Sequence, residues 1–333
     1  MKIHKNIKLA QYTTFHVGGR AEFFVEASSV DEVKEAVNFT RKNKLKLFIL
    51  GGGSNVLLPD KGLDGLVLKM NIKGIKFQDN LISAGAGESW DNIVAKAVAK
   101  DLGGIENLSL IPGTVGGAVY QNIGAYGVEL NDVLDTVEVF DTGSQSIKKL
   151  SNKKCDFGYR HSIFQQTKGS KYIILGANLK LSKNNVPNLK YPDLVKYFED
   201  KKPSISEIRK AVIKIRKSKL VYPTDSIGTA GSFFKNPIVA PEQFNKILKQ
   251  HPDMKGREIT KNQIKLFAGQ LVEKVGWKGK RLGNVGTSHK HSMVLVRYKG
   301  GKAPDLVKLS RLIQKSVKAR FGVHLEPEVK IIA

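Results

Sequence analysis

The spacing of apolar residues predicts four helices. In four stretches of the chain apolar side chains recur every three or four residues, which places them on one face of a helix. Residues that favour helix starts and stops mark the ends of these stretches. The expected starts are Ser29, Ser89, Ser204 and Pro304, and the expected stops of the second and fourth helices are Gly103 and Gly322. We expect the apolar faces to pack into the core rather than to contact a ligand.

Shorter apolar runs predict strands. They cover residues 45–50, 65–70, 81–85, 137–140, 172–179 and 293–297. Strands outnumber helices between residues 65 and 180, and both types mix on either side of that stretch. This order favours an α+β fold over a regular βαβ array. Changes in the pattern near Asn71 and across residues 219–228 indicate two boundaries.

Composition narrows the class of protein. A chain of 333 residues, of which 41% are hydrophobic, can bury the cores of two or three compact units. No apolar run reaches the length of a membrane span, and no apolar block follows the early charges, so we expect neither a span nor a signal peptide. The single cysteine, Cys155, cannot form an internal disulfide and is interpreted as a packing residue of a protein in a reducing cytoplasm.

The net charge of +25 has three interpretations. The lysines are spread along the chain, which is typical of a solvated basic surface. The sequence has no recognisable nucleic-acid motif and no basic block with interleaved aromatic residues, so nucleic-acid binding is disfavoured. Positive charge also raises the local concentration of anionic substrates around an enzyme.

Three glycine-rich segments lie in the first half of the chain. GGGSN at 51–55 follows a predicted strand, IPGTVGGA covers 111–118, and NIGAYG covers 122–127. Glycines let a backbone turn tightly and present several N–H groups to one point, which suits a pyrophosphate. GGGSN alone is equally compatible with a tight turn, and it lacks the GxGxxG spacing of a Rossmann site. Ordering three flexible loops costs entropy, so a shared extended ligand such as a dinucleotide explains them better.

In this order the three segments resemble the FAD-binding domain of flavoproteins of the vanillyl-alcohol oxidase and para-cresol methylhydroxylase (PCMH) type. Four further motifs resemble those of the UDP-N-acetylenolpyruvoylglucosamine reductase family, in the family's order. They are TTFHVGG at 13–19, FGYRHS at 157–162, GSFFKNP at 231–237 and LEPEVK at 325–330, and GSFFKNP is the most specific. The similarity runs from about residue 8 to the C-terminus. YPDL at 191–194 resembles the tyrosine-bearing insertion of the type I members.

The resemblance implies an α+β protein with a two-part FAD-binding domain of PCMH type and a C-terminal α+β substrate-binding domain. The first part spans residues 1–70 with the tail 320–333 returning to it, the second spans 71–219, and the substrate domain spans 220–319. FAD is expected without a covalent bond, because no histidine lies in residues 50–58. The implied cofactor contacts are Gly51, Gly52, Gly53, Ser54, Asn55, Pro112, Gly113, Thr114, Gly116, Gly117, Asn122, Gly124, Ala125, Tyr126 and Arg216.

The implied reaction is the NADPH-dependent reduction of UDP-N-acetylglucosamine enolpyruvate to UDP-N-acetylmuramate, a step of peptidoglycan precursor synthesis. Hydride addition at one carbon develops negative charge on the substrate carboxylate, which the planar guanidinium of Arg160 would stabilise. Ser232, helped by Lys235 or water, would deliver the proton to the neighbouring carbon. Glu328 would polarise the enolate or relay the proton, with Glu326 as the alternative. We expect a cytoplasmic monomer with no nucleic-acid or membrane partner.

The implied substrate contacts are Tyr191, Asn236 and Lys219, the last at the diphosphate. The stretch from Lys219 to Ser232 is about one residue longer than the type I pattern, so Lys217 stays open as an alternative. SHKHS at 288–292 also departs from the pattern, because many type I members carry a glutamine there that touches the uridine side. The roles of Lys290 and His291 therefore stay open, and no metal is expected because no third ligand is visible.

Two alternatives remain on the sequence. A flavin oxidase of the same superfamily would react with oxygen and need no NADPH, but it leaves GSFFKNP unexplained. A non-enzymatic basic binding protein would be colourless, and its nucleic-acid affinity would fall with salt.

Overall fold

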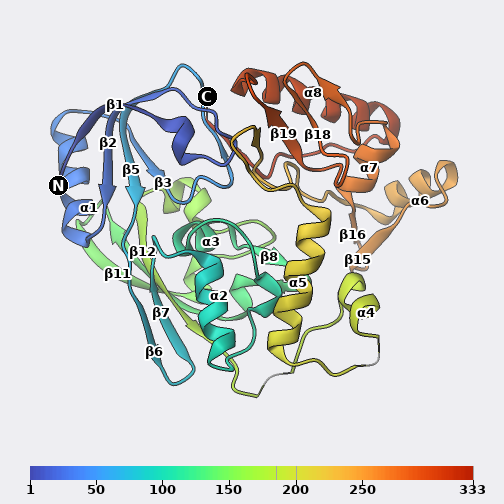
Figure 1. The fold of residues 1–333 in the computed structure, drawn as a ribbon, viewed down its shortest axis with the longest axis horizontal. Helices are drawn as coiled ribbons and strands as arrows, with labels where there is room; N and C mark the ends of the chain where they lie inside the picture. The colour runs from blue at the N-terminus through green and yellow to red at the C-terminus, as the bar shows by residue number, and fades with distance from the viewer. Residues whose placement is uncertain (185, 200, 333) are drawn as a thin grey trace. The chain divides into compact units, whose positions relative to one another are not determined.

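The computed structural model describes residues 1–184, 186–199 and 201–332, and the chain forms two compact units (Figure 1). Unit 1 comprises Met1–Ile7, Arg20–Gly53 and Leu63–Lys217. Unit 2 comprises Lys8–Gly19, Ser54–Gly62 and Ser218–Ala333. Each unit is therefore assembled from separate stretches of sequence. The division into three parts expected from the sequence stays a prediction.

The four expected helices are confirmed as α1, α2, α5 and α8. The helices are α1 (Val30–Lys42), α2 (Trp90–Ala99), α3 (Val115–Gln121), α4 (Pro192–Phe198), α5 (Ile205–Lys219), α6 (Pro241–Gln250), α7 (Ala268–Lys274) and α8 (Ala303–Phe321). At the start of α1 the Ser29 hydroxyl accepts a hydrogen bond from the Glu32 N–H at 3.2 Å, as the capping box predicts. Gly322 ends α8 with a φ of 65°, whereas α2 ends before Gly103.

Unit 1 contains a four-stranded sheet, a five-stranded sheet and the short pair β8-β9. The first has the order β1-β2-β5-β3, with β2, β5 and β3 parallel, and α1 packs against it. The second has the order β11-β10-β12-β7-β6 and is antiparallel. The strands of unit 1 are β1 (His4–Lys8), β2 (Arg20–Ala27), β3 (Leu47–Leu50), β5 (Leu63–Met70), β6 (Ile75–Gln78), β7 (Leu81–Gly85), β8 (Gly124–Ala125), β9 (Val128–Glu129), β10 (Leu134–Asp141), β11 (Ser146–Ser151) and β12 (Tyr172–Lys180).

Unit 2 contains shorter strands around one apolar core. Its sheets have the orders β13-β19-β18-β17 and β14-β16-β15, and β20 pairs with β4 in parallel. The strands are β4 (Val56–Leu57), β13 (Ile227–Gly228), β14 (Ile238–Val239), β15 (Gly256–Thr260), β16 (Gln263–Leu266), β17 (Arg281–Leu282), β18 (Val285–Thr287), β19 (Leu295–Tyr298) and β20 (Lys330–Ile331). The C-terminal strand thus joins the segment that follows GGGSN. All six strands expected from the sequence are present, and the α+β class is confirmed.

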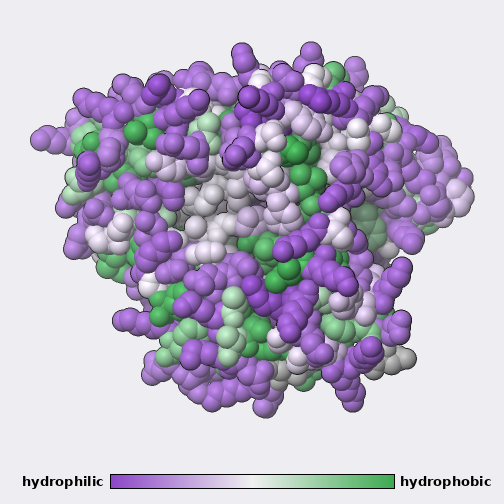
Figure 2. Space-filling view, in the orientation of Figure 1, coloured by the Kyte–Doolittle hydropathy of each residue, from purple (hydrophilic) through white to green (hydrophobic). Residues whose placement is uncertain are grey.

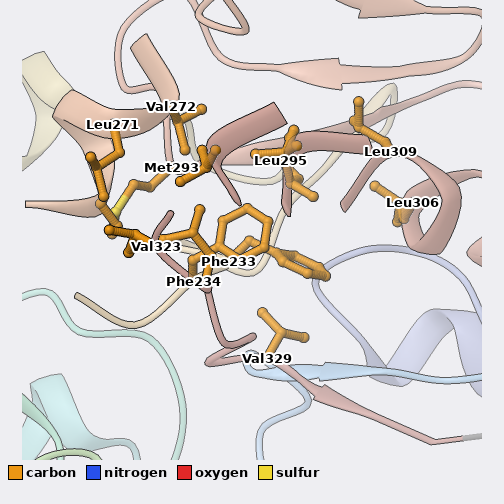
Figure 3. Packing of buried hydrophobic residues seen from close by; sticks show 14 of the residues in the cluster. Phe233, Phe234, Leu271, Val272, Met293, Leu295, Leu306, Leu309, Val323 and Val329 are labelled. Atoms are coloured by element: carbon orange, nitrogen blue, oxygen red, sulfur yellow. The ribbon is translucent and has the colours of Figure 1, made fainter. Parts of the chain in front are cut away.

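The core of unit 2 is built around two consecutive phenylalanines. Phe233 and Phe234 are fully buried, and their rings meet edge to face at 5.2 Å (Figure 3). Met293 and Leu295 around β19, and Leu306 of α8, are among the residues of the same cluster.

The surface is mostly polar, since hydrophilic side chains cover most of the face drawn in Figure 2. Across the described residues, no helix combines the length and apolar character needed to cross a membrane.

The carboxylate of Asp141 holds the turn between β10 and β11. It lies 2.6 Å from the Lys148 ammonium and accepts hydrogen bonds from the N–H groups of Gly143 and Ser144 at 2.8 and 3.4 Å. The hydrogen bond from Lys148, reinforced by these N–H groups, lowers the pKa of Asp141 from 3.8 to about 2. A carboxyl whose pKa is lower in the folded state stabilises the fold at neutral pH and loses that effect as it is protonated.

We therefore expect Asp141→Asn to destabilise the protein at pH 7. The difference in unfolding free energy between wild type and variant should shrink as the pH falls from about 4 to about 2, because protonation of wild-type Asp141 removes the same ion pair. Urea unfolding at a series of pH values measures this difference. A difference that stays constant down to pH 2 would show that the ionised form of Asp141 contributes nothing.

Candidate active site

The first two glycine-rich segments approach each other backbone to backbone in unit 1. A Cβ atom at Gly52 would stand 2.8 Å from the Cα of Gly113, and one at Gly51 would stand 3.0 Å from Thr114 Oγ1. Gly113 has a φ of 118°, a conformation that residues with a side chain rarely adopt. The glycines are therefore required for the packing of the two segments, before any ligand is considered.

The second segment is not a loop throughout, so that expectation was wrong for its last residues. Residues from Val115 onward belong to α3, and the Val115 and Gly116 N–H groups donate to Glu88 O and Ala86 O, both at 2.9 Å. A Cβ at Gly116 would lie 3.1 Å from the Ala86 Cβ, so glycine lets α3 approach this neighbouring strand end. These two N–H groups are used inside the protein and are not donors for a phosphate.

Two other donors of unit 1 fit an anionic cofactor. Thr114 Oγ1 and Arg216 Nε are buried and make no hydrogen bond within the described part of the chain. Arg216 is placed by α5, whose Arg209 binds Asp91 of α2 with two hydrogen bonds of 2.7 and 3.0 Å. Buried polar groups nearly always have partners, so these orphaned groups point to a bound ligand with oxygen acceptors.

The charge of Arg216 also acts on Asp91. Burial opposes the ionisation of Asp91, but the hydrogen bonds from Arg209 and the Leu110 N–H, with the charge of Arg216, lower its pKa below the ordinary value. The start of α2 is joined to the glycine cradle, because the Trp90 N–H donates to Gly113 O at 3.1 Å. Arg216 is thereby tied to the same part of unit 1 as the second glycine segment.

Arg160 sits in a tight turn against the third glycine segment. Gly158 and His161 exchange backbone hydrogen bonds of 3.1 and 3.0 Å, and Arg160 between them has a φ of 52°. That left-handed conformation costs a residue with a side chain about 1–2 kcal/mol. The Arg160 guanidinium donates to Gly124 O at 2.6 Å, and Gln165 Nε2 donates to the Arg160 carbonyl at 3.2 Å. The structure thus brings together Arg160 and Gly124, two residues that the sequence proposes for the site.

Asn122 supports this turn with its side chain. Its Nδ2 donates to Glu129 Oε2 at 2.9 Å and to Gly158 O at 3.0 Å, and its Oδ1 accepts from the Asn131 N–H at 3.0 Å. Both side-chain donors are therefore engaged within the protein. The cofactor contact proposed for Asn122 would have to use its backbone.

Tyr126 and Tyr191 meet directly. Their rings form an edge-to-face contact with centroids 5.0 Å apart. Tyr191 precedes α4, and burial, with a smaller effect of Asp193, raises the pKa of its phenol above the ordinary value. A proposed cofactor contact and a proposed substrate contact, 65 positions apart in sequence, are thus neighbours in unit 1.

Ser232 and Glu328 lie on adjacent backbone segments in unit 2. Gly231, with a φ of 70°, turns the chain before Ser232. The backbone of Ser232 pairs with that of Val294 in an isolated antiparallel bridge. The Glu328 N–H donates to Phe233 O at 2.7 Å, and Asn55 Nδ2 donates to Glu328 O at 3.1 Å. The structure therefore gathers the proposed proton donor, the proposed acid and the end of the first glycine segment.

The two acids near the C-terminus differ in their surroundings. Glu326 is exposed over 65% of its side chain and forms an ion pair with Lys235 at 3.5 Å. Glu328 is only partly exposed, and its N–H binds the residue next to Ser232. These differences favour Glu328 over Glu326 as the acid of the site. Lys235, which the sequence proposes as a helper of Ser232, has Glu326 as its ion-pair partner.

The remaining proposed substrate contacts also lie in unit 2. Asn236 Oδ1 accepts a hydrogen bond from the Ala268 N–H at the start of α7 at 2.9 Å. Burial first, and then the charges of Lys219 and Lys278, lower the pKa of His291, so this ring is neutral at pH 7. Lys219 therefore lies within electrostatic reach of the SHKHS segment, whereas Lys217 is assigned to unit 1.

Neither the single cysteine nor a metal site adds chemistry in the described residues. Cys155 is fully buried, and burial raises the pKa of its thiol to about 12, which agrees with its interpretation as a packing residue. Among the described residues, no group of three histidine, cysteine, aspartate or glutamate side chains is placed to hold a metal ion.

Two amide side chains that sequence reasoning missed support the site. Gln165 binds the carbonyls of Tyr120 and Arg160, and Asn107 binds those of Tyr126 and Asn188. Neither belongs to a residue type or spacing that signals chemistry. Only their position in space shows their role.

Comparison with known proteins places this arrangement in a family. The C-terminal domain model of UDP-N-acetylenolpyruvoylglucosamine reductase matches residues 222–332, and an FAD-binding domain model matches residues 21–151. The chain is 39% identical to the UDP-N-acetylenolpyruvoylglucosamine reductase of Flavobacterium johnsoniae, covering 100% of both chains. It is 41% identical to the enzyme of that name from Cupriavidus pinatubonensis, covering 99% of both.

The chain belongs to the UDP-N-acetylenolpyruvoylglucosamine reductase family. The structure is also similar to the crystal structure of the Thermus caldophilus member, with a TM-score of 0.72, 26% identity and 100% of both chains covered. The protein is thus an FAD-dependent oxidoreductase, and the FAD-binding and reductase-type domains expected from the sequence are confirmed.

The glycine cradle generates a prediction about FAD. Gly52→Ala would place a methyl group 2.8 Å from the Gly113 backbone, which cannot move aside as a side-chain end can. We expect a lower melting temperature of the apoprotein and at least about tenfold weaker FAD binding, because overpacking of this kind typically costs 1–3 kcal/mol. Differential scanning fluorimetry and flavin fluorescence titration measure the two effects.

Gly117→Ala is the matched control for this substitution. Its methyl group would meet Thr114 Oγ1 at 3.7 Å, an ordinary contact, at a helical position that alanine favours. The melting temperature of its apoprotein should not fall. Equal loss of stability in both variants would contradict the close approach of the two backbones.

Proposed function

We propose that the protein reduces the enolpyruvyl ether of UDP-N-acetylglucosamine to UDP-N-acetylmuramate, with NADPH as hydride donor, in the cytoplasm as a monomer. The names of its relatives supply the substrate class. The observation that carries the proposal in this chain is the hydrogen bond of 2.7 Å from the Glu328 N–H to the Phe233 carbonyl, which places the backbone of Glu328 beside the segment of Ser232. A carboxyl group on a segment next to the proton donor is what the proposed relay of a proton to the enolate needs.

FAD, when bound without a covalent link, supplies the transfer of hydride from NADPH to the substrate. The chain's part is to hold it. In the proposal, the segments 51–55, 111–118 and 122–127 surround the dinucleotide, with Thr114 and Arg216 as donors to its oxygen atoms. The orphaned Thr114 Oγ1 and Arg216 Nε support this placement.

Arg160 binds the substrate carboxylate and stabilises the charge that develops there. A guanidinium carries five N–H donors in a rigid plane. One of its two NH₂ groups donates to Gly124 O, and that bond fixes the orientation of the plane. A preorganised cation of this kind stabilises the transition state more than the ground state, because it needs no rearrangement as charge develops.

Ser232 donates the proton, and Glu328 polarises the enolate or relays the proton. A serine hydroxyl is a weak acid, so a neighbouring carboxyl that relays a proton makes the donation possible. Asn236, Lys219 and Tyr191 bind the rest of the substrate. The charge of Lys219 suits a diphosphate, and the half-buried phenol of Tyr191 next to Tyr126 offers an aromatic face.

The deciding experiment is a spectrophotometric assay of NADPH oxidation by the purified, yellow protein. Oxidation should depend on the enolpyruvyl substrate, and acid precipitation should release the flavin into the supernatant. NADPH-independent oxygen consumption with an alcohol or sugar would support the flavin oxidase alternative instead. Flavin retained in the acid pellet would contradict non-covalent binding.

Arg160→Lys tests the role of the guanidinium. Lysine keeps the charge but loses the planar pair of donors, so flavin reoxidation by the enolpyruvyl substrate should slow by about a hundredfold or more. Flavin reduction by NADPH should change little. Stopped-flow absorbance measures both half-reactions, and an equal fall in both would make Arg160 a structural or flavin-binding residue.

Ser232→Ala tests the proton donor. The variant should bind FAD and accept hydride from NADPH at nearly the wild-type rate, because neither step needs a proton at the substrate carbon. Reoxidation by the substrate should slow by about a hundred to ten thousandfold, the range for a lost general acid. Ser232→Cys should recover part of the rate, since a thiol can also donate a proton.

Ser226→Ala, at an exposed serine of the same unit, is the matched control and should leave both half-reactions unchanged. If Ser232→Ala reoxidises as fast as wild type, the proton comes from another group, with Glu328 or a bound water next in line.

A further inference from the structure

Asn107 links two segments of the proposed site through one buried side chain. Its Nδ2 donates to Tyr126 O at 2.9 Å and to Asn188 O at 2.8 Å, so both protons of the amide are used. The side chain is fully buried, and its Oδ1 makes no hydrogen bond within the described residues. One end of the link is the third glycine segment, 122–127. The other is the stretch 186–199, which carries Tyr191 and is called the Tyr191 segment below.

The base of this link is rigid. Asn107 lies in a short 3-10 turn, Glu106–Leu108, inside the main core of unit 1. Trp90 Nε1 donates to Leu108 O at 3.1 Å, and the Ser109 hydroxyl donates to Glu106 O at 2.6 Å. The backbone on both sides of Asn107 is therefore held, and its amide has a fixed direction.

Two further contacts join the same pair of segments. Asn188 Nδ2 donates to Gly127 O at 3.0 Å, and the rings of Tyr126 and Tyr191 touch edge to face. With the bridge through Asn107, they make three links between the two segments. The Tyr191 segment otherwise packs on unit 1 through Leu194 and Phe198 against α5.

We propose that Asn107 is a positioning residue that transmits cofactor binding at residues 122–127 to the Tyr191 segment. The inference rests on the proposed placement of FAD at the third glycine segment. A cofactor that orders residues 126 and 127 also orders the carbonyls to which Asn107 and Asn188 donate. The Tyr191 segment is then held in its substrate-binding position only when FAD is present, so an enzyme without its cofactor does not retain substrate.

Hydrogen exchange measured by mass spectrometry tests this coupling without turnover. In the wild type, FAD should slow amide exchange by about tenfold or more both in residues 122–127 and in the Tyr191 segment. In Asn107→Asp, which keeps the shape but loses both donors, FAD should still slow exchange in residues 122–127. The effect on the Tyr191 segment should fall to within about twofold of no change.

Asn152→Asp is the matched control. Asn152 Nδ2 also donates to two carbonyls of unit 1, Asn131 O at 2.9 Å and Leu134 O at 2.8 Å, but neither belongs to the linked segments. Its FAD response should match that of the wild type. Asn188→Asp removes the bond to Gly127 O at an exposed site, and it should weaken the response of the Tyr191 segment even if Asn107→Asp does not fold.

The inference is overturned if FAD slows amide exchange in the Tyr191 segment equally in the wild type, in Asn107→Asp and in Asn188→Asp. It is also overturned if Asn152→Asp loses the response to the same extent, because the effect would then be general destabilisation. Absence of protection at residues 122–127 in the wild type would reject the cofactor placement together with the coupling. Intact coupling in a protein that does not oxidise NADPH with the enolpyruvyl substrate would reject only the proposed reaction.

Discussion

The site depends on hydrogen bonds from side-chain amides to backbone carbonyls of loops. A buried carbonyl outside helices and sheets must find another donor, and leaving it unsatisfied costs about 1–3 kcal/mol. Four amide side chains supply such donors: Asn55, Asn107, Asn122 and Gln165. Each of them binds a carbonyl that lies within or next to a proposed functional segment. Because one amide can serve two carbonyls, a single side chain fixes two loops relative to each other.

In unit 2 the position of the Ser232 segment is fixed by apolar burial. Phe233 and Phe234, directly after Ser232, are anchored in the core, and Phe15 reaches Phe233 from a distant part of the sequence at 6.4 Å. Burying an aromatic side chain stabilises a fold by about 1.5–3 kcal/mol. The serine hydroxyl is thus carried by a segment whose neighbours cannot move without opening the core. This burial gives the GSFFKNP motif a structural function besides the chemical one proposed for it.

Charge acts at two ranges. Locally, burial and then the charges of Lys219 and Lys278 lower the pKa of His291. Burial opposes the ionisation of Asp91, but its hydrogen bonds with Arg209 and the Leu110 N–H, with the charge of Arg216, lower its pKa. At longer range, a net charge of +25 suits an enzyme whose proposed substrate and hydride donor are both anions. Salt screens the long-range effect far more than the local ones.

The sequence by itself determined the α+β class, four of the eight α-helices in the described part of the chain and the motifs that identify the family, because periodicity and motif spacing are local properties. It also named Arg160, Ser232 and Glu328 as candidates. It did not reveal α3, because two glycines in seven residues hide a short helix that is held by contacts with Ala86 and Glu88. Only the tertiary structure paired Glu328 with the Ser232 segment, set Tyr126 against Tyr191 and gave Asn107 its two partners. The physical reason is that these contacts join residues far apart in sequence, where no local pattern records which segments will meet.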